Sequence, residues 1–264
     1  MKRFIVVRLA QAALTLWLLS LAVFPAAYLL GPELGSQEYE QLKKNLGLDR
    51  PLIVQYGDFM LGLTHLDFGR SAVKGIPARD LFLQRLPATL ELALSAFVLS
   101  IIVGVPIGIL SAVKRDTIFD HFGKLFAVIG IAAPSFWVAI MGILLFGAIL
   151  GWLPTFGRGG LDHLILPACV LGWASMAGMV RLSRSSMLEV LDSEYVKFAR
   201  IKGLKESLVI WKHALKNAVI PVLTFSGLTL AGLLNGSVAI EVVFAWPGIG
   251  RLMLPGIQTR DFPI

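Results

Sequence analysis

Residues 88–112 read ATLELALSAFVLSIIVGVPIGILSA, and Glu91 is the one charged residue among them. Leu, Ile, Val, Ala and Phe supply most of the other positions. An α-helix that crosses the hydrocarbon core of a bilayer needs about 20 consecutive, mostly apolar residues. These residues therefore predict a membrane-spanning helix.

Four similar stretches occur elsewhere, at about residues 9–30, 122–150, 164–182 and 217–240. They explain why the 264-residue chain is 56% hydrophobic and only 16% charged, whereas soluble domains carry about 25% charged residues. The five stretches predict an all-α, polytopic membrane protein with about five spans. The first stretch is longer than the apolar core of a signal peptide, which has about 7–15 residues. We therefore interpret it as an uncleaved helix.

The basic residues indicate the orientation of the chain, because short cytoplasmic loops are enriched in Lys and Arg. Lys2, Arg3 and Arg8 precede or begin the first span, and residues 181–216 contain many Lys and Arg. We expect both regions to be cytoplasmic. Residues 31–86 have balanced charges with Gly and Pro between them, which predicts a folded extracytoplasmic insert.

Two other classes of function are disfavoured by the charge and metal-ligand patterns. The net charge of +7 is spread between apolar stretches, and nucleic-acid-binding proteins instead concentrate it on one face. The four histidines are dispersed, and Cys169, the single cysteine, lies in an apolar run. That spacing does not predict a metal site. We expect neither a nucleic-acid partner nor a bound metal.

Residues 194–204, EYVKFARIKGL, are too polar to insert into a membrane but lie between the last two predicted spans. They predict a short helix that ends at Gly203, since glycine is the usual residue just past a helix C-terminus. Such a helix is placed to dock against a cytoplasmic protein. A solvated basic loop that only sets the topology is an equally open interpretation of the composition.

The same segment, followed by HALKNA at residues 213–218 and by Pro221, resembles the EAA loop of ABC importer permeases. Its form, YVxxARxKG…HALxNAxxP, is typical of the family that imports dipeptides, oligopeptides and nickel. In that family the loop forms the coupling helix, which fits a groove on the ATP-hydrolysing subunit. The resemblance implies a coupling helix at residues 193–204. Its expected contact residues are Tyr195, Phe198, Ala199, Arg200, Lys202, Gly203 and Leu204.

Other motifs that resemble this family follow in order along nearly the whole chain, which we interpret as one permease domain over residues 1–264. They are LGLDRP (46–51), QY (55–56), LDFGRS (66–71), LPATLEL (86–92), PSFW (134–137), HLILPA (163–168), RSSMLEVL (184–191) and EVVFAWPGIGR (241–251). The family continues past the motif at residues 260–263 into a last helix. We expect this sequence to lack that helix.

The nucleotide-binding pattern Gly-x-x-x-x-Gly-Lys-Ser/Thr does not occur in the sequence. We therefore expect a non-catalytic transport subunit that binds no cofactor itself. The resemblance implies that ATP and Mg²⁺ bind to partner ATPase subunits. It also implies a second homologous permease subunit, an extracytoplasmic solute-binding protein, surrounding lipid and a location in the bacterial inner membrane.

Small residues allow close and adjustable packing of helices in lipid, and prolines kink helices. Two Gly-x-x-x-Gly pairs and three prolines in the predicted spans are therefore candidates for packing or gating, with static packing as open an interpretation as gating. The residues are Gly104, Pro106, Gly108, Pro134, Pro221, Gly232 and Gly236.

Ionisable residues near membrane depth are candidate functional residues. The candidates for the outer mouth and the translocation path are Glu91, Asn235, Glu241, Trp246, Pro247 and Gly248. We expect Glu241 to anchor a re-entrant segment at residues 246–248. For Glu91 we favour an interhelical or interfacial bond.

A self-contained secondary transporter or channel is the alternative function, and a membrane-embedded enzyme is a third. The transporter would favour internal repeats, and the enzyme would need a paired catalytic group. We find neither pattern in the sequence. The solute stays open between peptides, including glutathione, and nickel or metal chelates, because the short loop at residues 152–163 resembles members of both kinds.

Overall fold

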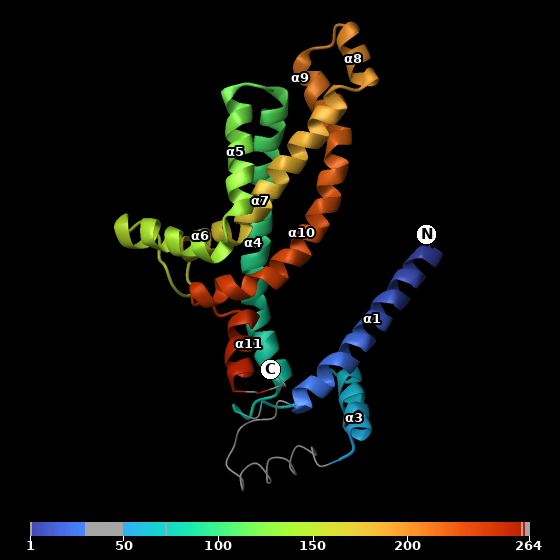
Figure 1. The fold of residues 1–264 in the computed structure, drawn as a ribbon, viewed down its shortest axis with the longest axis vertical. Helices are drawn as coiled ribbons and strands as arrows, with labels where there is room; N and C mark the ends of the chain where they lie inside the picture. The colour runs from blue at the N-terminus through green and yellow to red at the C-terminus, as the bar shows by residue number, and fades with distance from the viewer. Residues whose placement is uncertain (1, 30–49, 72, 260, 262–264) are drawn as a thin grey trace. The chain divides into compact units, whose positions relative to one another are not determined.

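A computed structural model describes residues 2–29, 50–71, 73–259 and 261. The chain forms two compact units, Met1–Gln84 with Leu252–Ile264, and Arg85–Arg251. Helices make up nearly all of the described secondary structure (Figure 1). The all-α class predicted from the sequence is therefore confirmed.

The first unit contains α1, Lys2–Leu29, and α3, Leu52–Thr64. The hydroxyl groups of Ser20 in α1 and Tyr56 in α3 form a hydrogen bond of 2.9 Å. After α11, Ile249–Gln258, the buried Asp261 accepts a hydrogen bond from the Ser71 hydroxyl. Residues 30–49, which hold much of the predicted insert, lie outside the described residues.

Helix α4, Ala78–Val113, begins inside the segment that was predicted as insert. The segment predicted as an insert up to residue 86 therefore includes the first turns of this helix. Arg79, Asp80 and Arg85 made this part of the sequence polar. A helix carries such charges readily where it extends beyond the apolar core of the membrane, because only the core excludes them.

The second unit holds the C-terminal part of α4 and the elements that follow it. In chain order these are α5 (Ile118–Ala132), α6 (Ser135–Gly142), the π-helix η1 (Ile143–Ile149), α7 (Leu161–Leu191), α8 (Glu194–Ile201), α9 (Glu206–Leu208), the π-helix η2 (Val209–Ala214) and α10 (Leu215–Val243). Helix α7 is central in this unit, since it packs against both α5 and α10 (Figure 1).

Helix α4 also approaches α7 closely, because glycines replace side chains at the contact. A Cβ atom on Gly104 would lie 2.6 Å from Met179 Cβ, and one on Gly108 would lie 2.6 Å from the Val180 carbonyl oxygen. The structure thus places the first glycine pair against α7. Pro106 lies between the two glycines inside α4, which continues through it.

Residues 122–150 do not form the one continuous helix that was predicted. Helix α5 ends at Ala132, and the helix Ser135–Ile149 runs at 106° to it. Pro134 explains the break, since proline cannot donate a helical hydrogen bond and disfavours helical backbone at the residue before it. Ala133 (ψ 123°) and Pro134 (ψ 136°) are both extended. Pro221 differs, because it lies inside α10 and the helix continues through it.

Three helices of the described chain are long and apolar enough to cross a membrane, and the bent pair α5–α6 with η1 would make a fourth. The three are Ala78–Val113, Leu161–Leu191 and Glu206–Val243. They contain the predicted spans 88–112, 164–182 and 217–240. In the region of the first predicted span, the described chain holds a shorter apolar helix, Ile5–Leu21, within α1.

Helix α7 is longer than predicted, and this changes the place of two basic residues. Arg181 and Arg184 were assigned to a cytoplasmic loop at residues 181–216, but they lie on α7, which continues to Leu191. The helix continues because Met187 and Leu191 are buried and extend its packed face. Helix boundaries thus do not coincide with the ends of apolar stretches.

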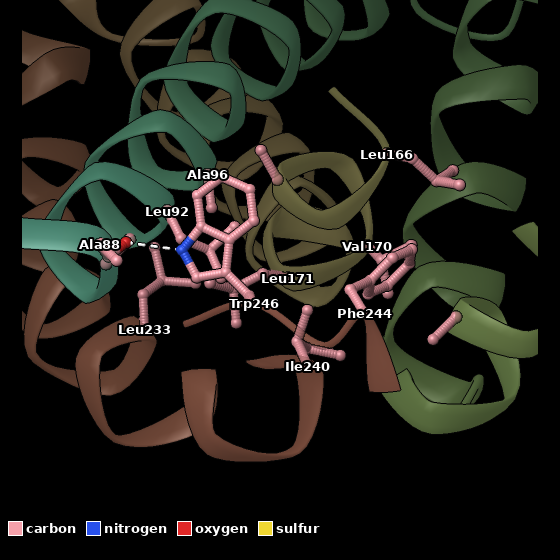
Figure 2. Packing of buried hydrophobic residues seen from close by; sticks show 13 residues of the cluster. Ala88, Leu92, Ala96, Leu166, Val170, Leu171, Leu233, Ile240, Phe244 and Trp246 are labelled. Atoms are coloured by element: carbon pink, nitrogen blue, oxygen red, sulfur yellow. Dashed lines mark hydrogen bonds between the residues drawn. The ribbon is translucent and has the colours of Figure 1, made fainter. Parts of the chain in front are cut away.

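A buried apolar cluster joins α4, α6, α7 and the end of α10 (Figure 2). Trp246, which follows α10, is fully buried in this cluster with Leu92 and Ile240. Its indole N–H donates a hydrogen bond of 2.8 Å to the Ala88 carbonyl oxygen. A buried indole N–H usually has an acceptor, so this bond allows the large side chain to be enclosed completely.

Candidate functional site

Helix α8 occupies the segment that was predicted to dock on a partner protein. Together with α9 it lies at the same end of the second unit as the turn between α4 and α5 (Figure 1). Gly203 follows the helix in the left-handed region, with φ +76°, and its N–H donates to the Arg200 carbonyl oxygen. Glycine adopts this conformation without steric penalty, which explains why the helix ends here.

One side of α8 is anchored in a second buried cluster. Val196 is fully buried, and Ala199 is 6% exposed. The cluster also includes residues from the ends of α4, α7, η2 and α10, namely Ile109, Ala112, Met187, Leu191, Val209, Ala214 and Ala218. Ala199 was predicted to contact the partner protein, but it faces this buried cluster, and the predicted contact stays untested. Its spacing from Val196 is the signal for a shared face, because residues three apart are neighbours on a helix.

The other side of α8 exposes large side chains. Phe198 is 56% exposed and Ile201 is 81% exposed. Tyr195 and Leu204 are exposed as well, and the Tyr195 hydroxyl accepts a hydrogen bond of 2.7 Å from the Asn217 side chain. Contiguous apolar exposure outside the membrane-spanning segments favours a contact with another protein. Ile201 was not among the predicted site residues, although its position three residues after Phe198 places it on the same side of the helix.

Polar contacts hold the turn that follows α8. The Arg200 guanidinium pairs with the Glu206 carboxylate over 2.8 Å and lies 3.5 Å from the Leu191 carbonyl oxygen. The hydrogen bonds to Glu206 raise the pKa of Arg200 above its already high ordinary value, and a guanidinium is charged at physiological pH in any case. Lys202 Nζ lies 4.7 Å from the centre of the Phe198 ring, within cation–π distance. Arg200 therefore connects α8 to α7 and α9, whereas Lys202 lies over the exposed side.

A buried carboxyl group holds the segment after α10. Glu241 is fully buried; its Oε1 accepts a hydrogen bond of 2.7 Å from the Thr89 hydroxyl, and its Oε2 accepts one of 3.2 Å from the Arg251 N–H. The Thr89 oxygen also accepts a bond from the Ile249 N–H. A Cβ on Gly248 would lie 2.3 Å from the Glu241 carboxyl carbon. The structure thus places Glu241 against the segment that it was expected to anchor.

Pro247 is held from α4. Arg85 Nη1 lies 3.5 Å from the Pro247 carbonyl oxygen, and the neighbouring Trp246 is bonded to Ala88 as described above. Thr89, Ala88 and Arg85, which lie together near the start of the second unit, were not among the predicted site residues. Their role depends on a segment that follows more than 150 positions later in the chain, which no local pattern indicates.

The remaining pathway candidates, Glu91 and Asn235, lie on two different helices, α4 and α10. Glu91 pairs with Arg158, with 2.8 Å between Glu91 Oε2 and Arg158 Nε. Asn235 is exposed on α10. Among the described residues, the Glu241 carboxylate bonds to Thr89 and Arg251 and not to Glu91 or Asn235.

The second glycine pair, Gly232 and Gly236, has open space beside it within the described chain. No described atom outside the immediate helix neighbourhood lies within 4 Å of a Cβ on Gly232 or Gly236. The pair therefore makes no close helix contact within the described chain, and its role in packing or gating stays a prediction. The reason is the orientation of α10, whose packed face carries the buried residues Leu233 and Ile240 and turns the glycines away from α7.

Comparison with known proteins identifies the family. Residues 104–264 match the binding-protein-dependent transport system inner membrane component family. The chain belongs to this family. Residues 1–93 of the permease match the N-terminal part of such membrane components. It is 38% identical to a putative peptide transport system permease protein of Brucella abortus (strain 2308), over 100% of this chain and 90% of the relative.

A second relative and a solved structure agree with this result. The permease is 40% identical to a dipeptide transport system permease protein of Alkalihalophilus pseudofirmus, over 91% of this chain and 80% of that protein. Its fold is similar to that of an inward-facing MetNI methionine ABC transporter, with a TM-score of 0.54 and 20% identity over 67% of this chain and 79% of the other. The permease is therefore a multi-pass inner-membrane subunit of an ABC importer, and the alternative of a self-contained transporter is not supported.

Proposed function

We propose that this permease forms part of a translocation path for peptides, and that separate ATPase subunits drive it through α8. The observation that carries the proposal is the division of α8 into two sides. Val196 is fully buried behind the helix, whereas Phe198 and Ile201 are exposed in front of it. A docked ATPase subunit would bury the front side, and the anchored side would pass its movement to the membrane helices.

The contacts around α8 support a lever mechanism. Helix α7 ends at Leu191, just before α8 begins at Glu194, and α9 and η2 lead from α8 into α10. The buried cluster around Val196 joins these ends. A tilt of α8 therefore moves the ends of α7 and α10, which is a suitable route between inward-open and outward-open states. ATP and Mg²⁺ bind to the ATPase partners, since the permease sequence has no P-loop motif.

Helix α10 offers a surface for a second homologous permease subunit. Its side opposite the packed face is exposed and carries small or polar residues between apolar ones. Residues on this side are Thr224, Leu228, Ala231 and Asn235. Small residues let helices approach closely in lipid, and an Asn side chain can bond across such an interface. The open space beside Gly232 supports the same assignment, with Asn235 as the candidate residue of the path.

The proposed solute is a peptide that an extracytoplasmic solute-binding protein delivers. The two relatives described above are named as peptide and dipeptide permeases. The proposed orientation places the N-terminus and α8 in the cytoplasm, because Lys and Arg are frequent near both and cytoplasmic loops favour them. The segment around Trp246 then lies towards the external side.

The test is peptide uptake by the complete transporter, with ATPase subunits and binding protein, in proteoliposomes. Ile201 is 81% exposed, so Ile201→Glu leaves the permease folded but puts a carboxylate into the docking contact. Because burying an unpaired charge is unfavourable, we expect ATPase binding to weaken by about tenfold or more. ATP-dependent uptake of a labelled dipeptide should fall with it.

Leu161→Glu is the matched control. Leu161 is 80% exposed and is the first residue of α7, so it lies at the opposite end of that helix from α8. We expect this variant to bind the ATPase normally. Wild-type binding and uptake in Ile201→Glu would contradict the docking assignment. ATP-dependent uptake of nickel, but not of dipeptides, by the unmodified transporter would contradict the proposed solute.

A further inference from the structure

A fully buried carboxylate joins three helices at the end of the second unit where α8 lies. The side chain of Asp120, near the start of α5, has no exposed surface. Arg184 of α7 donates to both of its oxygens, with Nε 2.6 Å from Oδ1 and Nη2 3.0 Å from Oδ2. The Ser111 hydroxyl of α4 donates to Oδ1 over 2.7 Å. Asp120 therefore holds α4, α5 and α7 together through directional bonds.

Two further donors surround the same carboxylate. The Asp116 N–H lies 3.1 Å from Oδ2. Lys124 Nζ lies 2.8 Å from Oδ2, but its side chain is 44% exposed and it belongs to α5, one turn after Asp120. Lys124 thus balances charge without joining another helix. The sequence pattern marked Arg184 only as part of a family motif and did not mark Asp120.

Arg184 lies on the helix that anchors α8. Met187 and Leu191 follow it along α7 and belong to the buried cluster that holds Val196 and Ala199. A displacement of α8 therefore reaches Arg184 through about two turns of one continuous helix. The ion pair with Asp120 is then the next contact, and it leads to α4 and α5.

Small residues make several other close contacts between these helices, which also share a hydrogen bond from the Ser100 hydroxyl to the Gly172 carbonyl oxygen and an edge-on contact of Phe126 with Trp173. Gly108 of α4 faces the Val180 backbone, and Gly130 of α5 faces the Ala177 methyl group. Contacts of this kind keep helices close, but they are dispersive and have little directional preference. A guanidinium that bonds both carboxylate oxygens fixes distance and orientation together. The pair is therefore suited to prevent α7 from sliding along α4 and α5.

We propose that Asp120 and Arg184 are positioning residues for coupling, which make α4 and α5 follow α7 when α8 moves. This inference rests on the proposed docking of an ATPase subunit at α8. Without the pair, the ATPase subunits still dock and still hydrolyse ATP. Helix α7 then moves without its neighbours, and the path opens less often for each ATP consumed.

The test measures the number of ATP molecules hydrolysed per dipeptide imported by the complete transporter in proteoliposomes. Asp120→Asn keeps the size of the side chain and removes its charge. We expect the number of ATP molecules hydrolysed per dipeptide to rise about tenfold, which is within the range of factors by which coupled sites typically affect each other. ATPase binding should be unchanged. Lys124→Ala is the matched control, because it removes a contact to the same carboxylate that stays within α5. We expect it to keep the wild-type ratio.

Arg184→Lys provides a second variant that is not subject to the same folding risk. It keeps the positive charge but loses the two-pronged geometry, so we expect a ratio between those of the wild type and Asp120→Asn. If Asp120→Asn yields no folded permease, Arg184→Lys alone decides. A proportional fall of ATPase activity and uptake, at an unchanged ratio, would overturn the proposal, since a structural defect alone reduces the amount of active transporter. An equal rise in Lys124→Ala would overturn it as well.

The experiment gives a different result if the proposed function itself, ATP-driven dipeptide import through docking at α8, is wrong. In that case the unmodified complex would not retain ATPase subunits, or would not import dipeptide with ATP, and both proposals would fall. An unmodified complex that imports dipeptide, while the Asp120 and Arg184 variants keep its ratio, refutes only the role of the ion pair.

Discussion

The second unit contains two fully buried carboxyl groups, Asp120 and Glu241, and they have different kinds of hydrogen-bond partner. Near α8, Asp120 is paired with the cations of Arg184 and Lys124. At the far end of α10, the donors to Glu241 are the Thr89 hydroxyl and the Arg251 backbone N–H. The first carboxylate thus has charged partners, and the second has neutral ones.

The difference corresponds to what each group joins. Asp120 connects three helices that approach closely at glycine residues, and a strong, directional ion pair fixes their positions. Glu241 holds a short segment that Trp246 already fixes by its burial among Leu92 and Ile240. Neutral hydrogen bonds suffice there, because packing supplies most of the constraint. Charged partners thus hold the helices that the proposed coupling would move together, and neutral partners hold a segment that packing already fixes.

Removing the two carboxyl groups should give the largest contrast. Asp120→Ala leaves the Arg184 guanidinium without its buried partner, which costs about 3–5 kcal/mol in the free energy of unfolding. Glu241→Ala leaves a hydroxyl and an N–H unsatisfied, at a cost of about 1–3 kcal/mol. Unfolding of the purified permease in detergent micelles by a denaturing detergent measures both. Equal losses of unfolding free energy in the two variants would show that the charge of the hydrogen-bond partners does not determine how much each carboxyl group stabilises the protein.

Gly248→Ala tests whether a glycine is required at this position because the Glu241 carboxyl group lies so close to it. The added Cβ would lie 2.3 Å from the Glu241 carboxyl carbon, so the carboxyl group must leave Thr89 and Arg251. We expect a loss of about 1–3 kcal/mol, similar to that of Glu241→Ala, because the same bonds are broken.

The matching measurement is a double-mutant cycle. In the Glu241→Ala background the methyl group of Gly248→Ala meets no carboxyl group, so its additional effect should be close to zero. Residues in direct contact typically show interaction energies of about 0.5–3 kcal/mol in such cycles. Additive losses would mean that Gly248 is required for another reason than the closeness of Glu241.

Local sequence patterns predicted those parts of the fold that depend on neighbouring residues alone. The apolar stretches gave the all-α membrane class, and the polar segment with Gly203 gave the short helix that the structure has at Glu194–Ile201. Pro134 was predicted to kink its helix, but a kink and a complete break have the same sequence signal. The choice depends on whether the following residues find packing partners in the new direction, and Ala139 of α6 is fully buried in the apolar cluster.

Pairings across the chain were not predicted, because they depend on the tertiary arrangement. Arg184 and Asp120 are 64 positions apart, and neither their spacing nor their neighbours indicate that they meet. The two Gly-x-x-x-Gly pairs look alike in the sequence, yet Gly104 packs on α7 while Gly232 has open space beside it. A glycine pair indicates that another helix can pack closely there. Which helix does so depends on the side of its own helix that faces the rest of the protein, and the sequence pattern does not give this.

The smallest effect is expected at an ion pair that lies outside both buried sites. Arg158 and Glu91 are close in space, but their side chains are 43% and 34% exposed. Water screens exposed pairs and ordering long side chains is unfavourable, so Arg158→Ala should cost about 0.2–1 kcal/mol. The same unfolding titration measures it, and Arg50→Ala, which breaks a pair with both side chains 60% exposed, gives the lower reference. A loss near that of Asp120→Ala would mean that proximity of opposite charges outweighs burial. The distinction drawn between the two buried carboxyl groups would then lose its physical basis.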